Sequence, residues 1–230
     1  GYSDSDSSSD KNENCKNASY DYWIVKLDSL GNIQWQNTIG GDYQDYLTSM
    51  TLTKTGGYIC AGRSNSRLDG DKLDSCKGGF DYWILELDTL GNIVWQKTIG
   101  GALDDHLTSI SSLSGDGYIC GGSSRSHTSG DKIEMALGWD YWVLKLDLQG
   151  NILWQNTIGG NSVYNLASIE QTNDGGFICG GNSFSDISGE KSIPNKGLWG
   201  TDDFWIVKLD SLGGIQWQKS FGGINEDDLN

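Results

Sequence analysis

An internal repeat of about 60 residues runs through the whole sequence. The tripeptide Asp-(Tyr/Phe)-Trp occurs four times, and successive copies start 60, 59 and 63 residues apart by subtraction. Each copy is followed in step by a second tryptophan and then by a Gly-Gly pair. The copies start at Asp21, Asp81, Asp140 and Asp203, the second tryptophans are Trp35, Trp95, Trp154 and Trp217, and the pairs begin at Gly40, Gly100, Gly159 and Gly222. Three features that keep one register over four copies indicate a repeat architecture.

Each period predicts four short strands separated by turn residues. The first such set of segments comprises 47–53, 58–64, 22–27 and 33–39. The stretch Lys54-Thr55-Gly56-Gly57 joins the first two, and its glycines can adopt positive φ, so these two segments predict a hairpin. The stretch Asp28-Ser29-Leu30-Gly31 predicts a tight turn between the other two.

The segment that starts at Tyr22 predicts a sheet buried on both faces. Trp23, Val25 and Leu27 alternate along one face, and Tyr22 and Ile24 lie on the other. A strand that is apolar on both faces belongs to a sheet packed between two others.

Four-stranded units that repeat and need a neighbour on either side are typical of a β-propeller. We therefore expect an all-β fold, a β-propeller built of four-stranded antiparallel blades, with about four repeats forming a single region over residues 1–230. A β-sandwich is the structural competitor, but its strands normally leave one face in contact with water. Both ends of the sequence fall inside a repeat, so we expect a part of a larger ring or multi-repeat protein.

The charge balance argues against two classes of partner. Sixteen basic and 31 acidic side chains give a net charge of −15, which repels nucleic acid and anionic lipid surfaces. The sequence contains no run of 18 apolar residues, so we expect no membrane insertion.

The repeated strings Asp-Tyr-Trp-Ile-Val-Lys-Leu-Asp-x-x-Gly-Asn-Ile-x-Trp-Gln and Asp-Gly-Gly-(Tyr/Phe)-Ile-Cys-Gly-Gly-x-Ser resemble the propeller repeats of secreted and cell-surface proteins of Bacteroidota. The resemblance covers essentially the whole chain. It implies export, commonly by type IX secretion, and a modular protein on the outer cell surface or outside the cell, in which propellers bind or space other domains. A weaker likeness is to pyrroloquinoline quinone propellers, whose strands also end in Leu-Asp-x-x-Gly-x-x-x-Trp.

Two loops between the second and third strands contain closely spaced carboxylates. Hard oxygen ligands at a spacing of two suit Ca²⁺. The candidate ligands are Asp4, Asp6 and Asp10 in one loop and Asp69, Asp71 and Asp74 in another. Calcium is the one cofactor that the sequence suggests. The alternative interpretation, which we favour, is a set of solvated acidic loops with an Asp-Lys turn that recurs at Asp10-Lys11, Asp71-Lys72 and Asp131-Lys132.

Residues present in every repeat are interpreted as structural. The four aspartates that start the repeats could form a ring of carboxylates, but their recurrence beside tryptophan favours backbone capping. Cys60, Cys120 and Cys179 share one register and are expected to be buried, whereas Cys15 and Cys76 lie in loops and could pair.

Trp199 is the one tryptophan outside the repeated pattern, so it is a candidate for stacking on a sugar, although loop tryptophans more often anchor their own loop. The two histidines carry no nucleophile or zinc spacing, so the sequence indicates no catalytic residue.

Three functions remain open from the sequence. The favoured one is a non-catalytic extracellular binding, adhesion or scaffold propeller that contacts a protein or glycan ligand, or neighbouring domains, through the loops between second and third strands. The alternatives are a propeller enzyme, either a quinoprotein or a carbohydrate-active one, and a passive spacer in a surface filament.

Overall fold

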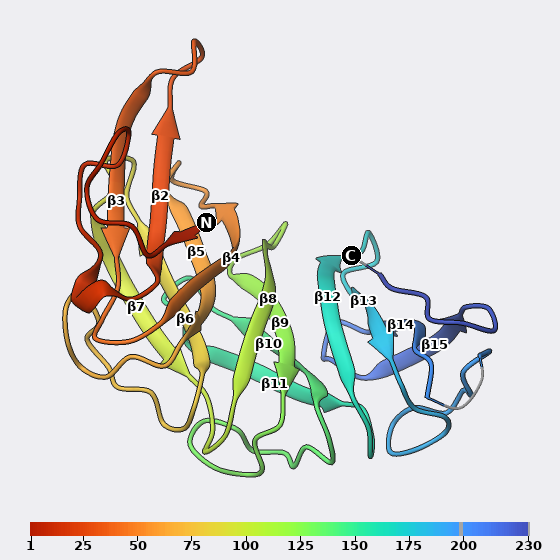
Figure 1. Ribbon diagram of the computed structural model, residues 1–230. Helices are drawn as coiled ribbons and strands as arrows, with labels where there is room; N and C mark the ends of the chain where they lie inside the picture. The colour runs from red at the N-terminus through yellow and green to blue at the C-terminus, as the bar shows by residue number, and fades with distance from the viewer. Residues whose placement is uncertain (198–199, 230) are drawn as a thin grey trace.

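The computed structural model describes residues 1–197 and 200–229, and it confirms an all-β fold (Figure 1). The described part of the chain contains no α-helix, only the 3-10 helix η1 (Lys16–Ala18). None of these residues belongs to a helix that is long and apolar enough to cross a bilayer.

Fifteen described strands form four antiparallel sheets that follow one another along the chain. The first sheet has three strands in this part of the chain: β1 (Tyr2–Ser3), β2 (Asp21–Leu27) and β3 (Ile33–Ile39). The second has β4 (Asp45–Leu52), β5 (Tyr58–Ser64), β6 (Asp81–Leu87) and β7 (Ile93–Ile99). The third has β8 (Asp105–Ser112), β9 (Tyr118–Ser124), β10 (Asp140–Leu146) and β11 (Ile152–Ile158). The fourth has β12 (Tyr164–Gln171), β13 (Phe177–Ser183), β14 (Asp203–Leu209) and β15 (Ile215–Phe221).

Each full sheet has the strand order of a propeller blade, with every strand paired to the next one in the chain. The four sheets stand side by side in chain order, and the described strands do not close into a ring (Figure 1). The first strand of a blade packs against the preceding one: β8 lies beside β4 and β5, and β12 lies beside β8 and β9. The predicted blades are therefore confirmed as a propeller-like fold.

A bulge in the first strand of the blades reaches across to the next blade. The register shifts at Thr48 in β4 and at Thr108 in β8, where one extra residue is inserted. The Thr48 hydroxyl donates a hydrogen bond to the Leu107 carbonyl at 2.8 Å, and the Thr108 hydroxyl donates to the Leu166 carbonyl at 2.7 Å.

Three apolar cores lie between the sheets, and each is built in the same way. A tyrosine of one blade packs on the Asp-x-Trp tryptophan of the next, and its hydroxyl donates to that tryptophan's backbone carbonyl. The pairs are Tyr22 with Trp83, Tyr82 with Trp142 and Tyr141 with Trp205, at 3.0, 3.0 and 3.3 Å. The tryptophans are 0% exposed, so they form the core as the sequence predicts.

Turn glycines complete these contacts on the outer strands. Gly91, Gly150 and Gly213 have φ of +90°, +74° and +89° and lie on the rings of Trp35, Trp95 and Trp154 of the preceding blade. A methyl group at Gly150 would lie 2.7 Å from the Trp95 ring. Glycine is required there both for the left-handed backbone and for the close approach to the indole.

Burial on both faces holds for the inner sheets but not for the first one. Leu85 and Leu87 of β6 are 0% exposed, whereas Val25 and Leu27 at the same repeat positions of β2 are 37% and 53% exposed. Our expectation for the segment that starts at Tyr22 is thus wrong for one face, because no described element covers it.

Candidate binding surface on one rim

The loops between second and third strands lie on one rim of the sheets, where the second to fourth of them run along the lower edge of the view (Figure 1). Each loop contains the same tight turn, closed by hydrogen bonds between a residue and the lysine three positions later. The turns are Ser8 to Lys11, Asp69 to Lys72, Ser129 to Lys132 and Ser188 to Lys191. The second loop's turn places Gly70 in the left-handed region, with φ of +60°.

The acidic residues of these turns are exposed or partly exposed, as the interpretation as solvated loops expects, but the lysine of each turn is buried. Lys72 and Lys132 are each 1% exposed, Lys191 is 0% exposed and Lys11 is 5% exposed. The Lys72 ammonium lies 4.7 Å from the Trp83 ring centroid and donates to the Thr98 hydroxyl at 2.7 Å. Lys132 makes the same contacts with Trp142 and Thr157. The buried side chains of Lys72 and Lys132 therefore anchor their loops to the blade.

Burial also changes the acidity of these ammonium groups. It lowers the pKa of Lys132 and of Lys191 to about 8, and it lowers the pKa of Lys72.

The acidic residue before three of the buried lysines, Lys72, Lys132 and Lys191, is hydrogen-bonded to the preceding blade. The Asp71 amide donates to the Gly40 carbonyl at 2.9 Å, and the Asp71 carboxylate accepts from the Gly40 amide at 3.3 Å. Asp131 makes both contacts with Gly100. These carboxylates therefore serve the contact between blades.

The proposed calcium ligands are not gathered by the described structure into a group of three or more metal-binding side chains. The Asp71 carboxylate accepts a hydrogen bond from the Gly40 amide, and the Asp69 carboxylate accepts one from the Gly70 amide. The charge of Asp4 raises the pKa of the Tyr20 hydroxyl. Backbone carbonyls of Asp6, Asp10 and Asp74 accept from Ser8, Gln36 and Thr98. Calcium binding stays a prediction of the sequence.

The aspartates that start the repeats cap loop backbone, as their recurrence predicts. Asp21 accepts from the Lys16 amide at 2.5 Å, Asp81 from the Lys77 amide at 2.6 Å and Asp140 from the Leu137 amide at 2.9 Å. The Asp203 carboxylate accepts from the Lys196 amide. Burial raises the pKa of Asp21 and of Asp81 to about 7.

All five cysteines are free thiols. Cys15 and Cys76, which could have paired, donate instead to the carbonyls of Ser3 and Ser64 at 2.9 and 2.8 Å. Cys60, Cys120 and Cys179 are buried as expected.

A continuous line of aromatic and cationic side chains lies beside these loops, and we call it the rim arc. Its members come from three repeat positions: the second residue of the first strand, the second-to-last residue of the second strand, and the residue before the third strand. The rim arc comprises Tyr2, Tyr20, Tyr46, Arg63, Phe80, His106 and Trp139, together with Arg125 from the third loop.

Ring-to-ring contacts connect the rim arc from the first sheet to the third. Tyr2 packs edge-on against Tyr46, with 4.8 Å between the ring centroids. The ring of Tyr46 in turn contacts that of Phe80, with 5.9 Å between their centroids. His106 then bridges Phe80 and Trp139 at 5.5 and 4.8 Å. Such offset and edge-to-face pairs hold the rings in place.

Two guanidinium groups lie over this line of rings. The Arg63 guanidinium is 5.0 Å from Tyr46 and 5.5 Å from Phe80, and the Arg125 guanidinium is 5.5 Å from Trp139. Burial, and then the charge of Arg63, lowers the pKa of His106 to about 4, so its imidazole is neutral at pH 7. The buried Arg63 Nε and His106 Nε2 atoms have no hydrogen-bond partner in the part of the chain that the structure describes.

The same three repeat positions become polar and acidic in the last blade. They hold Asn165, Asn182 and Asp202, and the next first-strand position holds Asp228. The Asn182 amide donates to the Asp228 carboxylate at 2.6 Å. Burial, and then Asp228, raises the pKa of Asp202 to about 6. The rim thus changes from aromatic and cationic to amide and acidic along the chain.

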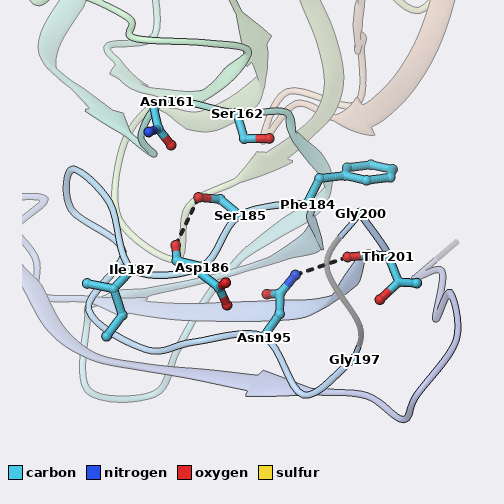
Figure 2. Close-up of a pocket in the computed structure, with 10 residues that line it drawn as sticks. All are labelled: Asn161, Ser162, Phe184, Ser185, Asp186, Ile187, Asn195, Gly197, Gly200 and Thr201. Carbon is cyan, nitrogen blue, oxygen red and sulfur yellow. Dashed lines mark hydrogen bonds between the residues drawn. The ribbon is translucent and has the colours of Figure 1, made fainter.

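Two hollows border the polar half of this rim. One, of about 510 Å³, is lined by Arg125, His127 and Trp139 on one side and by residues 161–163 on the other. The second, of about 350 Å³, lies under the fourth loop (Figure 2). There Asn195 donates to the Thr201 carbonyl at 3.2 Å, and the Ser185 hydroxyl donates to the Asp186 carbonyl at 2.9 Å. The candidate sugar-stacking residue, Trp199, lies outside the described residues.

Sequence reasoning placed the contact surface on this rim but missed the rim arc itself. Its residues come from three segments of each repeat and meet only through strand pairing, such as Arg63 with Tyr46 and Tyr82. The signal that could have found them is variation: at these positions the otherwise similar repeats differ.

Comparisons with known proteins add no family to these observations: no protein-family model matches the chain, and no curated protein does.

Proposed function

We propose that this protein is a non-catalytic binding module that holds a neutral carbohydrate on the rim arc, on the outside of a bacterial cell. The observation that carries the proposal is the rim arc, because it concentrates sequence variation between the repeats on one connected aromatic surface. In a repeat protein, frame positions recur and contact positions differ.

Aromatic rings beside polar side chains are the chemistry that recognises sugars. The apolar face of a sugar ring stacks on an aromatic side chain, and its hydroxyl groups need donors and acceptors. Tyr2 is 50% exposed and Trp139 is half-buried, so both offer ring surface. Exposed polar groups line hollows beside the rim arc: Asp4 lies in a hollow with Tyr20, and Asn161 lies in one with Trp139.

The overall charge of the protein favours one class of glycan over another. At a net charge of −15 the protein repels polyanionic glycans at long range, which favours neutral ones. Export to the cell exterior rests on the resemblance to Bacteroidota repeats, and it suits a protein whose ligand is a surface or environmental glycan.

A glycan array followed by calorimetric titration of the strongest ligand tests the proposal. We expect Trp139→Ala and Tyr2→Ala each to weaken binding by roughly tenfold or more, as truncation of an aromatic contact residue commonly does. The control is Leu90→Ala, which removes an exposed side chain in the turn between β6 and β7, away from the rim arc. An array without a ligand, or a ligand whose affinity survives both aromatic substitutions, would refute the assignment.

A further inference from the structure

The position four residues after the buried lysine differs among the four loops between second and third strands. In the first two loops it is a cysteine, so the pattern Lys-x-x-x-Cys occurs at Lys11 to Cys15 and again at Lys72 to Cys76. The third and fourth loops carry Ala136 and Asn195 at this position. The lysine is therefore common to all four loops, whereas a thiol after it is particular to two.

The first loop holds the nitrogen and the sulfur of such a pair together. The Lys11 Nζ atom lies 3.5 Å from the Cys15 Sγ atom, and it donates to the Glu13 carbonyl at 2.6 Å. Lys11 is 5% exposed and Cys15 is 7% exposed. Because both side chains are buried, packing keeps the two atoms near each other.

Two other loops show the same contact in different chemistry. In the fourth loop the Lys191 ammonium donates to the Asn195 side-chain carbonyl at 2.6 Å. In the second loop burial raises the pKa of Cys76 to about 11, and the charge of Lys72 opposes that rise. The residue at this position therefore lies near the ammonium in the first, second and fourth loops.

An open hollow of about 660 Å³ gives small molecules access to Cys15, which lines it. Its other walls come from residues 37–39 of β3 and from Asp71 and Gly91 of the second blade. The susceptibility of a thiol to oxidation depends on such access. Hydrogen peroxide is little larger than water, so this hollow admits it.

The partners of the Cys15 sulfur include one group that can capture it after oxidation. In the described part of the chain, the thiol donates to the Ser3 and Ser5 carbonyls at 2.9 and 3.3 Å, and the sulfur accepts from Lys11. A carbonyl oxygen forms no stable bond to a sulfenic acid, whereas a nitrogen condenses with it and releases water.

We propose that Lys11 and Cys15 form an oxidation site, at which a peroxide joins the Cys15 sulfur to the Lys11 nitrogen. First the thiol loses its proton and its sulfur attacks one oxygen of hydrogen peroxide. The O–O bond breaks, and a sulfenic acid and one water molecule form. The neutral amine of Lys11 then attacks the sulfur, so that the S–N bond forms and the S–O bond breaks. The hydroxyl group leaves with a proton of the amine as a second water molecule.

The net change is small and specific to the loop. The sulfur gives two electrons to the peroxide, and the pair loses two hydrogen atoms without gaining oxygen. The bridge closes a ring over residues 11–15 and fixes the first loop at its buried lysine. The third and fourth loops, which have no cysteine at this position, cannot react in this way.

Peptide mapping of the 230-residue chain carrying Cys76→Ala tests the proposal. This substitution removes the second Lys-x-x-x-Cys thiol and any disulfide between the two loops, and the third repeat already has alanine there. Burial, and then the charge of Asp21, raises the pKa of the Cys15 thiol. The chain is therefore treated with hydrogen peroxide at about pH 9, where more of the thiol and the amine has lost its proton. Remaining thiols are blocked with iodoacetamide, and the chain is digested with trypsin without reductant.

Mass spectrometry should find residues 1–16 as one peptide that is uncut after Lys11 and about two mass units lighter than the unmodified sequence. A thiol reductant should restore cleavage after Lys11. Cleavage after Lys132, the lysine four residues before Ala136, should be the same with and without peroxide.

Two variants separate the bridge from ordinary thiol oxidation. Lys11→Arg keeps the charge and the tryptic site, but its guanidinium stays protonated and cannot attack sulfur. This variant should be cut after residue 11, and its Cys15 should be recovered as a sulfenic acid by dimedone labelling. Cys15→Ala should be cut after Lys11 with or without peroxide.

The proposal is overturned if Lys11 stays cleavable in the Cys76→Ala chain, whether Cys15 gains oxygen, joins a second chain or remains reduced. The lighter uncut peptide in either variant would overturn it as well. The result on the chain with both Lys11 and Cys15 decides the proposal even if a variant does not fold.

Discussion

Adding one methyl group at Gly150 measures how tightly neighbouring blades pack on their outer strands. Gly150 and Gly31 occupy the same repeat position, with φ of +74° and +83°. Both donate to the carbonyl of the aspartate three residues earlier, at 3.2 and 3.1 Å. They differ in surroundings: Gly150 lies against the Trp95 ring, and Gly31 faces open space among the described residues.

The expected magnitudes follow from this difference. Either alanine substitution places a side chain in the left-handed region, which costs about 1–2 kcal/mol of unfolding free energy. At Gly150 the new methyl would also lie 2.7 Å from the indole, and such overpacking costs about 1–3 kcal/mol more. We therefore expect Gly150→Ala to lose more stability than Gly31→Ala by about 1–3 kcal/mol.

Urea unfolding followed by circular dichroism gives both free energies. The two substitutions are made singly in the wild-type chain. Equal losses for the two substitutions would refute the reasoning, because they would mean that backbone strain alone decides the effect and that the blades do not press the turn against the indole.

Two further predictions concern acidity and the uncovered face. Burial raises the pKa of Asp21 and Asp81 to about 7, so between the unfolded value near 3.8 and 7 the folded state binds more protons; stability therefore increases as the pH falls from 8 to 5, by at most about 1 kcal/mol per pH unit for each group. Asp81→Asn should flatten this slope in thermal melts, and a slope identical to that of the wild type would count against burial as its source. Leu146→Ala, at a 0% exposed position, should cost about 2–5 kcal/mol in urea unfolding. Leu27→Ala, at the same repeat position but 53% exposed, should cost under about 1 kcal/mol, and equal costs would contradict the exposure difference.

The strands and turns of the blades could be predicted because each depends on local chemistry. Alternation of apolar residues marks β2, and the Asp28 to Gly31 stretch forms the predicted turn, with Asp28 accepting from the amides of Leu30 and Asn32. The exposure of Leu27 could not be predicted from its own segment, because burial of one face depends on whether another sheet stands beside it.

The loops and the rim could be predicted only in part. Asp10-Lys11 and its repeats look like ordinary charged turns, and nothing in the dipeptide tells that the lysine enters the blade beside a tryptophan. The partner of Lys72, Thr98, lies 26 residues away, so the buried contact exists only after the strands have paired. The rim arc was hidden for the same reason, since strand pairing brings Arg63 to Tyr46.

The buried lysine and the capping aspartate hold the two ends of each loop on the blade, and described residues of the stretch between them touch it at single points, as Cys15 does at the Ser3 carbonyl. That stretch already differs in length, because lysine and aspartate are 10, 9, 8 and 12 residues apart by subtraction in the four loops. A replaceable cassette is the result: new residues can be grafted between Lys191 and Asp203 while the anchors keep the fold in register. Evolution, or a protein engineer, can thus change what the rim offers to its surroundings without redesigning the sheets beneath.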